Sequence, residues 1–255
     1  MQEQISAQLS SIEQVNGVTV LYAAESGSRA WGFASPDSDY DVRFIYVRPQ
    51  RDYLRLDKVR DVIEWQQDEV LDINGWDLQK ALRLLHNSNP TLFEWNGSPI
   101  VYKTTEAWSA IQQEFNRYFL LRAGLNHYLS TANSNYRTYL KVEEVRLKKY
   151  FYVLRPLLAC KWILDRKCPP PMLFLDLVEE ELEPGMRQTV DALLQLKSQT
   201  PEIGTGKRID ALNEYIDAAL VDLKLAIGAL PPDEKPRWQP LNDLFLAVVQ
   251  SVSPS

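Results

Sequence analysis

The spacing of hydrophobic and polar residues changes near residue 104. Before that point, short apolar runs typical of strands alternate with helical spacing, in which apolar residues recur every three or four positions. Helices are predicted over 5–15 and 78–85, with Asp77 suited to the first turn of the second helix. Strands are predicted over 18–24, 41–47, 61–66 and 70–73. This part of the chain therefore predicts a sheet with helices packed on it.

From residue 104 onward the pattern is that of long helices. Prolines interrupt it, and proline ends helices because it lacks an N–H group and clashes with the preceding turn. The spacing predicts helices over 105–130, 135–165, 173–182, 185–198, 207–229 and 241–252. We therefore expect an α+β protein with two domains: a mixed sheet with helices over residues 1–103, followed by an α-helical domain over residues 104–255.

Composition restricts the classes of protein to which the chain can belong. Hydrophobic residues make up 45% and charged residues 24% of its 255 residues, which is typical of a folded globular chain and excludes global disorder. Acidic residues outnumber basic ones, 34 to 28, and no dense block of Lys and Arg occurs. A net charge of −6 gives no general attraction to nucleic acid, so we expect no extended DNA-binding surface.

The sequence carries no pattern typical of a leader or a membrane span. Residues 1–4 have neither a basic nor an apolar character, and the longest apolar run is interrupted by Arg155, Pro156 and Lys161. Two cysteines are too few for a disulfide framework or a zinc cluster, so we expect reduced thiols. We expect a cytoplasmic protein without a membrane partner.

The candidate chemistry begins at Gly27-Ser28, directly after the strand predicted over 18–24. Glycine lets the backbone turn tightly and leaves its N–H groups accessible, and the start of a following helix adds the positive end of a dipole. The Ser28 hydroxyl adds one more donor. These groups together predict a cradle for phosphate oxygens.

A pair of acids follows at Asp39-Tyr40-Asp41, where the next predicted strand begins. Residues i and i+2 of a strand point to the same face, so these carboxylates would repel each other. A divalent cation removes the conflict, and Mg²⁺ usually binds through one or two carboxylates together with substrate phosphates. The sequence therefore predicts a site for Mg²⁺ and a nucleoside triphosphate. Carboxylates that point apart, or that are locked to arginines without room for an ion, would contradict it.

The spacing of these two elements resembles a known signature. Gly27-Ser28 followed by Asp39-Tyr40-Asp41 is similar to the Gly-Ser and Asp-X-Asp motifs of the DNA polymerase β-like nucleotidyltransferase superfamily. A wider resemblance is to the YcgL-type nucleotidyltransferases, some of which are called RlaP and are linked to RNA repair. It covers most of residues 18–172 and is carried by the segments 25–46, 72–78, 88–90, 98–102 and 149–158.

This resemblance implies a polymerase β-like domain and a nucleotidyltransferase activity. In that superfamily an acceptor hydroxyl attacks the α-phosphate of an NTP, the nucleoside monophosphate is transferred and pyrophosphate leaves. Two metal ions, Mg²⁺ or Mn²⁺, offset the charge that develops. The acceptor is not defined by the sequence: it could be an RNA end, a protein hydroxyl or a small molecule.

The superfamily also implies a third metal-binding carboxylate on a neighbouring strand. Asp72, which lies between two apolar residues and comes just before a helix, is our first choice, and Glu64 has the same local pattern. Asp77 is a third alternative, although we interpret it as a helix cap. The predicted catalytic and metal-binding residues are therefore Asp39, Asp41 and Asp72.

Other charged residues near the motif have alternative interpretations. Arg29 follows the turn and either reaches a phosphate or is solvated; we include it among the nucleotide-binding candidates with Gly27 and Ser28. Arg43 shares the face of Asp41 if the strand is regular, and it either contacts the triphosphate or, as we favour, balances local negative charge. For Glu25 we expect a buried ion pair with an arginine.

The helical domain contributes two further candidates, Lys149 and Arg155, in a stretch rich in aromatic residues. In enzymes of the superfamily a helical domain faces the cleft, and by this resemblance both residues are candidates for contact with the triphosphate or the acceptor. The alternative is that their aliphatic stems pack on the core while the charged ends reach solvent.

Two functions of other classes stay open. The protein could bind NTP or RNA without transferring a nucleotide. Alternatively, the Arg-X4-His pattern over 122–127 resembles the catalytic motif of HEPN ribonucleases. Five residues apart is a poor spacing for one face of a helix, because helical neighbours are three or four residues apart.

Overall fold

The computed structural model describes residues 1–66, 70–199 and 204–252 of the chain. By backbone contacts it divides into two compact units. The first consists of Met1–Ala30, Asp39–Tyr118 and Lys235–Ser255, and the second of Trp31–Ser38 and Phe119–Glu234. These boundaries differ from the predicted domains, 1–103 and 104–255, in that residues 31–38 are grouped with the helices, while residues 104–118 and the C-terminal helix are grouped with the sheet. The predicted division into two domains stays a prediction.

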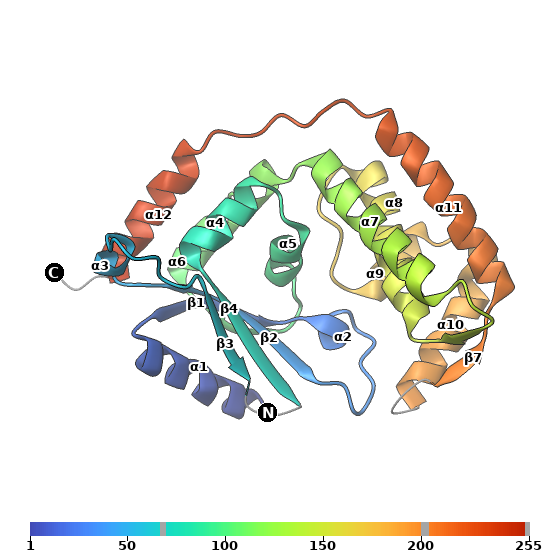
Figure 1. Ribbon diagram of the computed structural model, residues 1–255, viewed down its shortest axis with the longest axis horizontal. Coiled ribbons are helices and arrows are strands. Elements are labelled where there is room, and N and C mark those ends of the chain that lie inside the picture. Colours follow the sequence, from blue (N-terminus) through green and yellow to red (C-terminus); the bar gives the residue numbers. More distant parts are fainter. Residues whose placement is uncertain (67–69, 200–203, 253–255) are drawn as a thin grey trace. The chain divides into compact units, whose positions relative to one another are not determined.

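The first unit contains the sheet and most of the short helices (Figure 1). Its elements, in chain order, are α1 (Gln2–Asn16), β1 (Thr19–Glu25), α2 (Gly27–Ala30), β2 (Tyr40–Val47), α3 (Gln50–Tyr53), β3 (Val62–Gln66), β4 (Leu71–Asp77), α4 (Leu78–His86), α5 (Pro90–Asn96), β5 (Val101–Thr104), α6 (Glu106–Gln112), the 3-10 helix η1 (Phe115–Tyr118) and α12 (Gln239–Val252).

The five strands form one mixed sheet in the order β3-β4-β2-β1-β5. Only the central pair, β2 and β4, is parallel, and the other neighbouring pairs are antiparallel. Helix α1 covers one face, where Ile5, Leu9 and Ile12 pack on buried strand residues such as Val42 and Phe44. Since strand side chains alternate between faces, the odd-numbered residues of β2 point to the other face, toward the side of α4, α5 and α6 (Figure 1).

The turn between β4 and α4 confirms the predicted helix cap. Asp77 is almost fully buried, and its carboxylate accepts a hydrogen bond from the backbone N–H of Gln79, 2.8 Å away. It also accepts from the Tyr53 hydroxyl at 3.1 Å. The cap fixes where β4 ends, and therefore which residues of β4 lie beside β2.

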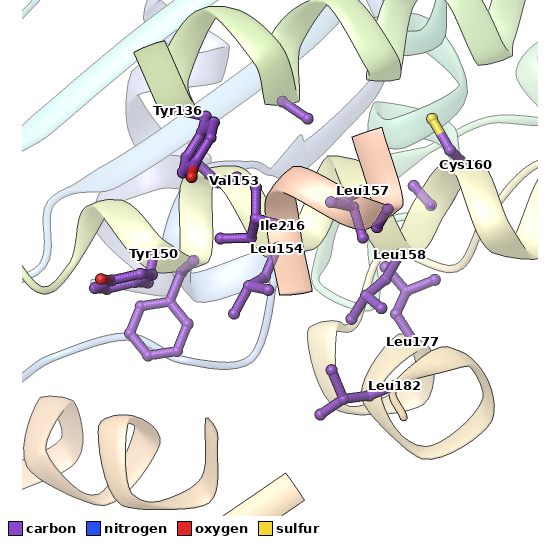
Figure 2. Packing of buried hydrophobic residues seen from close by; sticks show 14 of the residues in the cluster. Tyr136, Tyr150, Val153, Leu154, Leu157, Leu158, Cys160, Leu177, Leu182 and Ile216 are labelled. Atoms are coloured by element: carbon purple, nitrogen blue, oxygen red, sulfur yellow. The ribbon is translucent and has the colours of Figure 1, made fainter. Parts of the chain in front are cut away.

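The second unit consists mainly of helices: α7 (Leu121–Tyr139), β6 (Glu144–Arg146), α8 (Lys149–Arg166), α9 (Phe174–Glu181), α10 (Pro184–Gln199), β7 (Thr205–Lys207) and α11 (Asp210–Gly228). The buried face of α8 supplies the centre of its core, with Leu154, Leu157 and Leu158 packed against α9 and α11 residues such as Leu177 and Ile216 (Figure 2). None of the helices in the described part of the chain is both long and apolar enough to cross a membrane.

The expected α+β class is confirmed, whereas two of the predicted long helices are wrong. The helix predicted over 105–130 is three pieces, α6, η1 and the start of α7. The helix predicted over 135–165 is interrupted between Tyr139 and Lys149, where β6 pairs with β7. The helix α5 and the strand β5 lie beyond Ser88-Asn89-Pro90 and were not predicted. The remaining predicted helices and strands are present with shifted ends.

Candidate functional site

The candidate site lies at the start of the parallel strand pair. Asp41 of β2 is the direct partner of Asp72 of β4 in the strand register. Both carboxylates point to the face opposite α1, because Val42 and Ile73, their neighbours in sequence, are buried against that helix. Their side chains are 32% and 43% exposed. The register thus sets two partly solvated carboxylates side by side, as predicted from the sequence for Asp41 and for the first-choice Asp72.

The turn between β1 and α2 lies against Asp41. The N–H of Ser26 donates to the carbonyl of Asp41 at 2.8 Å, and Gly27 has a φ of +62°, in the left-handed region that favours glycine. A Cβ atom on Gly27 would lie 2.1 Å from Oδ2 of Asp41. Within the described residues, the half-buried hydroxyl of Ser28 makes no hydrogen bond. The predicted phosphate cradle and carboxylate are therefore adjacent, and only glycine permits that approach.

Glu25 holds the backbone of Asp41 in place. It is fully buried, and Oε1 accepts from the backbone N–H of Asp41 at 2.8 Å. Oε2 accepts from the Tyr102 hydroxyl in a short hydrogen bond. Burial raises the pKa of the Glu25 carboxyl, against the hydrogen bonds that lower it. The expected ion pair with an arginine is wrong: a tyrosine and a backbone amide are the direct partners, and Arg29 contributes only a weaker electrostatic attraction.

Arg43 joins the two carboxylates. Its Nη2 donates to Oδ1 of Asp41 and to Oδ2 of Asp72, each at 2.8 Å. Its Nη1 donates to the backbone carbonyls of Val42 at 3.2 Å and Asp72 at 3.3 Å. The side chain is 18% exposed. The interpretation of Arg43 as a balance for local negative charge is confirmed.

One guanidinium does not neutralise the cluster. Burial is the largest cause of the raised pKa of the Asp41 carboxyl; the attraction of Arg43 opposes it, and repulsion by Asp72 and Asp39 adds to it. The net shift is upward although Arg43 is only 2.8 Å away. Arg43 brings one positive charge to two carboxylates, so the ionised pair keeps an excess of negative charge, a condition that favours a further cation.

Asp39 and Arg29 lie at the edge of the cluster. Asp39 is exposed and precedes β2. Arg29 donates from Nε to the carbonyl of Asp39 at 3.0 Å, and its guanidinium stacks on the ring of Tyr40 at 3.7 Å. Arg29 thus ties the turn to the start of β2, and its predicted contact with a phosphate stays a prediction.

The fit of a metal ion can be tested against this geometry. Mg²⁺ prefers carboxylate oxygens, so Asp39, Asp41 and Asp72 suit it in kind. They do not suit it as arranged: in residues 1–66, 70–199 and 204–252, no three Asp, Glu, His or Cys side chains form a group that could hold a metal. Arg43 moreover holds two of the three carboxylates, which is part of the condition set out above as contradicting a metal site. The metal and its three ligands therefore stay a prediction.

The alternatives to Asp72 lie elsewhere. Glu64 is paired with Asn74 in the register between β3 and β4, and its side chain, 59% exposed, forms an ion pair with Arg60 at 2.7 Å. Asp77 is occupied as the cap of α4. Asp72 alone of the three candidates is in register with Asp41.

Lys149 and Arg155 belong to the second unit. The Lys149 ammonium lies over the rings of Tyr139 and Tyr152, at 4.1 and 4.9 Å. Arg155 is 4% exposed, its guanidinium lies 4.7 Å from the ring centre of Trp31, and Nη2 donates to the carbonyl of Met172 at 3.4 Å. Their contact with a nucleotide stays a prediction, which the burial of Arg155 disfavours.

The ribonuclease alternative concerns α7, also in the second unit. The guanidinium of Arg122 donates to the carbonyl of Leu230 at 3.1 Å, and the Asp233 carboxylate accepts from the backbone N–H of Arg122 at 2.9 Å. His127 is exposed on the same helix. Arg122 thus already serves to fasten the end of α11 to α7, and no observation here favours RNA cleavage.

Sequence reasoning missed one residue of the site, Tyr102. It lies on the edge strand β5, which was not predicted, and reaches Glu25 only because β5 pairs with β1. The run Val101-Tyr102-Lys103-Thr104 is rich in residues that favour strands. This composition was the signal that could have found the strand.

A mixed sheet sets two carboxylates in register beside a Gly-Ser turn, an arrangement that agrees with the resemblance to the polymerase β-like nucleotidyltransferases. Comparison with protein-family models narrows the class. Residues 1–247 match the model of RlaP, described as the RNA repair pathway DNA polymerase beta family, and the chain belongs to this family. The resemblance carried by residues 25–46 and the later segments is thereby confirmed.

Two known proteins are similar to the chain over its full length. The uncharacterized protein YcgL of Bacillus subtilis (strain 168) is 42% identical over 257 residues, covering 99% of this chain and 98% of the relative. A solved nucleotidyltransferase-like protein from Exiguobacterium sibiricum 255-15 aligns with 100% of this chain and 81% of its own, at 13% identity and a TM-score of 0.32. At that score the structural similarity carries no argument, and the family assignment depends on the sequence.

Proposed function

We propose that this protein is a Mg²⁺-dependent nucleotidyltransferase that moves a nucleoside monophosphate from an NTP to an acceptor hydroxyl and releases pyrophosphate. The observation that carries the proposal is the register of Asp41 with Asp72 beside the Gly27 turn, in a chain of the RlaP family. A carboxylate pair next to a glycine turn matches the two parts of a metal-triphosphate, its cation and its phosphate oxygens.

Each part of the site has a role in this proposal. The backbone N–H groups at Gly27 and the unpaired Ser28 hydroxyl bind phosphate oxygens and orient the triphosphate. Glu25 fixes the Asp41 backbone through its hydrogen bond to the N–H group. Asp39, Asp41 and Asp72, which are not grouped around a metal site in this arrangement, would hold Mg²⁺, or Mn²⁺ in its place, after Arg43 has released Asp41 and Asp72. When bound, the metal supplies charge neutralisation at the phosphates and lowers the pKa of the acceptor hydroxyl.

For the acceptor we propose the hydroxyl at an RNA end. The support is the family's description, which places it in an RNA repair pathway. The net charge of −6 argues against a long nucleic-acid footprint, because phosphate contacts dominate such binding. A single terminal nucleotide needs no extended basic surface, so an RNA end is compatible with this charge.

The test is transfer of label from each of the four α-labelled NTPs to short RNAs with defined ends, in the presence of Mg²⁺ or Mn²⁺. The variant Asp41→Asn removes one negative charge at constant shape. Loss of a residue behind a metal ligand already costs ~10–100-fold, so we expect at least a ~100-fold loss of transfer. Glu64→Gln is the matched control, since Glu64 is an exposed carboxylate of the neighbouring strand β3 tied to Arg60, and it retains full transfer.

Two results would contradict the proposal. Transfer by Asp41→Asn at the wild-type rate would exclude the carboxylate pair from the chemistry. Tight NTP binding by the wild-type protein without release of pyrophosphate, across RNA ends and with cell extract as a source of acceptors, would favour a protein that binds nucleotide and transfers nothing.

A further inference from the structure

The guanidinium of Arg43 occupies the position that joins the two candidate ligands Asp41 and Asp72. Four acceptors hold it: one carboxylate oxygen of each aspartate, both at 2.8 Å, and the backbone carbonyls of Val42 and Asp72. Such multiple donation orients a planar guanidinium well. Arg43 therefore links strands β2 and β4 through specific hydrogen bonds and is not a loosely held surface charge.

The strand geometry creates this arrangement. In the parallel pair, Asp41 is opposite Asp72, and Arg43 is opposite Asn74. Positions i and i+2 of a strand share a face, so Arg43 follows Asp41 on the side of the carboxylates. The neutral Asn74 leaves Asp72 as the anionic side chain of β4 within its reach. One cation is thus shared between two anions that the register would otherwise set against each other.

A metal ion and this guanidinium compete for the same oxygens. Asp41 and Asp72 would hold Mg²⁺ through their carboxylate oxygens, the ligands that this ion prefers. The Arg43 Nη2 lies 2.8 Å from Oδ1 of Asp41 and from Oδ2 of Asp72. A divalent cation held by these two oxygens would repel the guanidinium and would weaken its hydrogen bonds to them, because both cations draw on the same negative charge.

We propose that Arg43 is an internal counter-cation that occupies the Asp41–Asp72 bridge in the metal-free protein and must leave it when a divalent cation enters. This inference rests on the proposed function, because it concerns the metal site named there. The metal-free protein is then stable, because Arg43 balances the two carboxylates. Free Mg²⁺ or Mn²⁺ binds weakly, because it must displace a bound guanidinium.

The experiment compares Mn²⁺ binding by the full-length wild-type protein and by Arg43→Gln, with no nucleotide present. Free Mn²⁺ is counted by its electron paramagnetic resonance signal. Arg48→Gln is the matched control: Arg48 is a partly buried arginine one residue beyond β2 that pairs with Asp77 at 3.6 Å, not with the candidate ligands. We expect Arg43→Gln to bind Mn²⁺ at least tenfold more tightly than wild type, and Arg48→Gln to bind as wild type does.

Thermal unfolding gives a second readout that does not depend on activity. In EDTA, Arg43→Gln loses stability because two carboxylates face each other without a cation, and added Mn²⁺ restores it. Arg48→Gln also loses stability, but Mn²⁺ does not restore it. If Arg43→Gln does not fold, Arg43→Lys is used, since lysine keeps the charge but loses the planar fork; its Mn²⁺ affinity is then expected above that of wild type.

Failure of this inference and failure of the proposed function give different results. If Arg43→Gln gains neither Mn²⁺ affinity nor metal-dependent stability while the wild-type protein transfers nucleotide, the counter-cation is refuted and the function stands. If the variant gains both while the wild-type protein transfers nothing to any acceptor, the counter-cation stands and the function is refuted.

Discussion

Replacing Gly27 with alanine tests the close approach between the turn and the acidic pair. The substitution adds one carbon atom, which would lie 2.1 Å from Oδ2 and 3.1 Å from Cγ of Asp41. An ordinary contact begins near 3.4 Å, so the carboxylate must move away. Moving the carboxylate strains the 2.8 Å hydrogen bond that its Oδ1 accepts from Arg43.

The chain supplies a matched control for the backbone cost. Gly17, the C-cap of α1, has a φ of +60°, against +62° for Gly27, and nothing lies within 4 Å of a Cβ atom placed there. Gly17→Ala therefore carries only the cost of an alanine in the left-handed region, ~1–2 kcal/mol. In both variants this cost is reduced by the same gain, because alanine restricts the unfolded chain more than glycine does. Gly27→Ala adds the displaced charge-assisted hydrogen bond, about 1–2 kcal/mol for a pair that is partly exposed.

The assay is urea denaturation followed by circular dichroism, repeated in an Asp41→Ala background. That background removes Oδ2 and Cγ and leaves Cβ of residue 41 at 3.5 Å from the new methyl group, an ordinary contact. We expect Gly27→Ala to cost more than Gly17→Ala in the wild-type chain, and the excess to vanish when Asp41 is alanine. Equal costs in the wild-type chain, or an excess that persists without the carboxylate, would refute the reasoning.

Two further predictions concern buried charged groups. Asp77→Ala removes the cap of α4 and leaves the Tyr53 hydroxyl without its acceptor and Arg48 without its ion-pair partner, so the free energy of unfolding in urea falls by about 3 kcal/mol; a loss below 1 kcal/mol would argue against the cap. Burial lowers the pKa of Lys197 to about 8 from 10.5, so the unfolded chain binds more protons between these values and stability rises with pH there. The free energy of unfolding of the wild-type protein should therefore rise by up to about 3 kcal/mol relative to that of Lys197→Met between pH 7.5 and 10.5. A difference between the two proteins that does not change with pH would contradict the lowered pKa.

The orientation of Asp41 could be predicted because it is local: strand alternation turns it to the face opposite the buried Val42. The turn at Gly27 follows from the lack of a side chain. The same-face arrangement predicted for Asp39 and Asp41 stays a prediction, because Asp39 precedes β2 and strand alternation does not orient it.

The choice between Asp72 and Glu64 is not local. It depends on which strand pairs with β2, and the structure shows that β4 lies beside β2 while β3 lies at the outer edge. Both residues lie between two apolar neighbours, and the order of the strands decides which of them lies opposite Asp41.

The wrong helices fail for the same physical reason, which is that distant contacts override local spacing. Around η1 the chain leaves the helical path without a proline or glycine to mark the break, and Phe115 packs against Phe93 and Trp108. Between α7 and α8, Val145 leaves the helix to pair with Gly206 of β7, far along the chain. Neither contact can be recognised from periodicity within one segment, because the partner lies outside it.

Arg43 shows how one rule of strand geometry produces two competing outcomes. The alternation that turns Asp41 toward Asp72 turns Arg43 to the same side, so a sequence with a metal-binding spacing also carries its own cation. A guanidinium brings one positive charge to a pair of carboxylates, with Asp39 near the start of the strand adding a third negative charge. The carboxylates therefore still lack positive charge, which a divalent cation would supply. Under the proposed function, the site therefore favours a metal that arrives with a triphosphate over a free one, because the phosphate oxygens give the displaced guanidinium a new anionic partner.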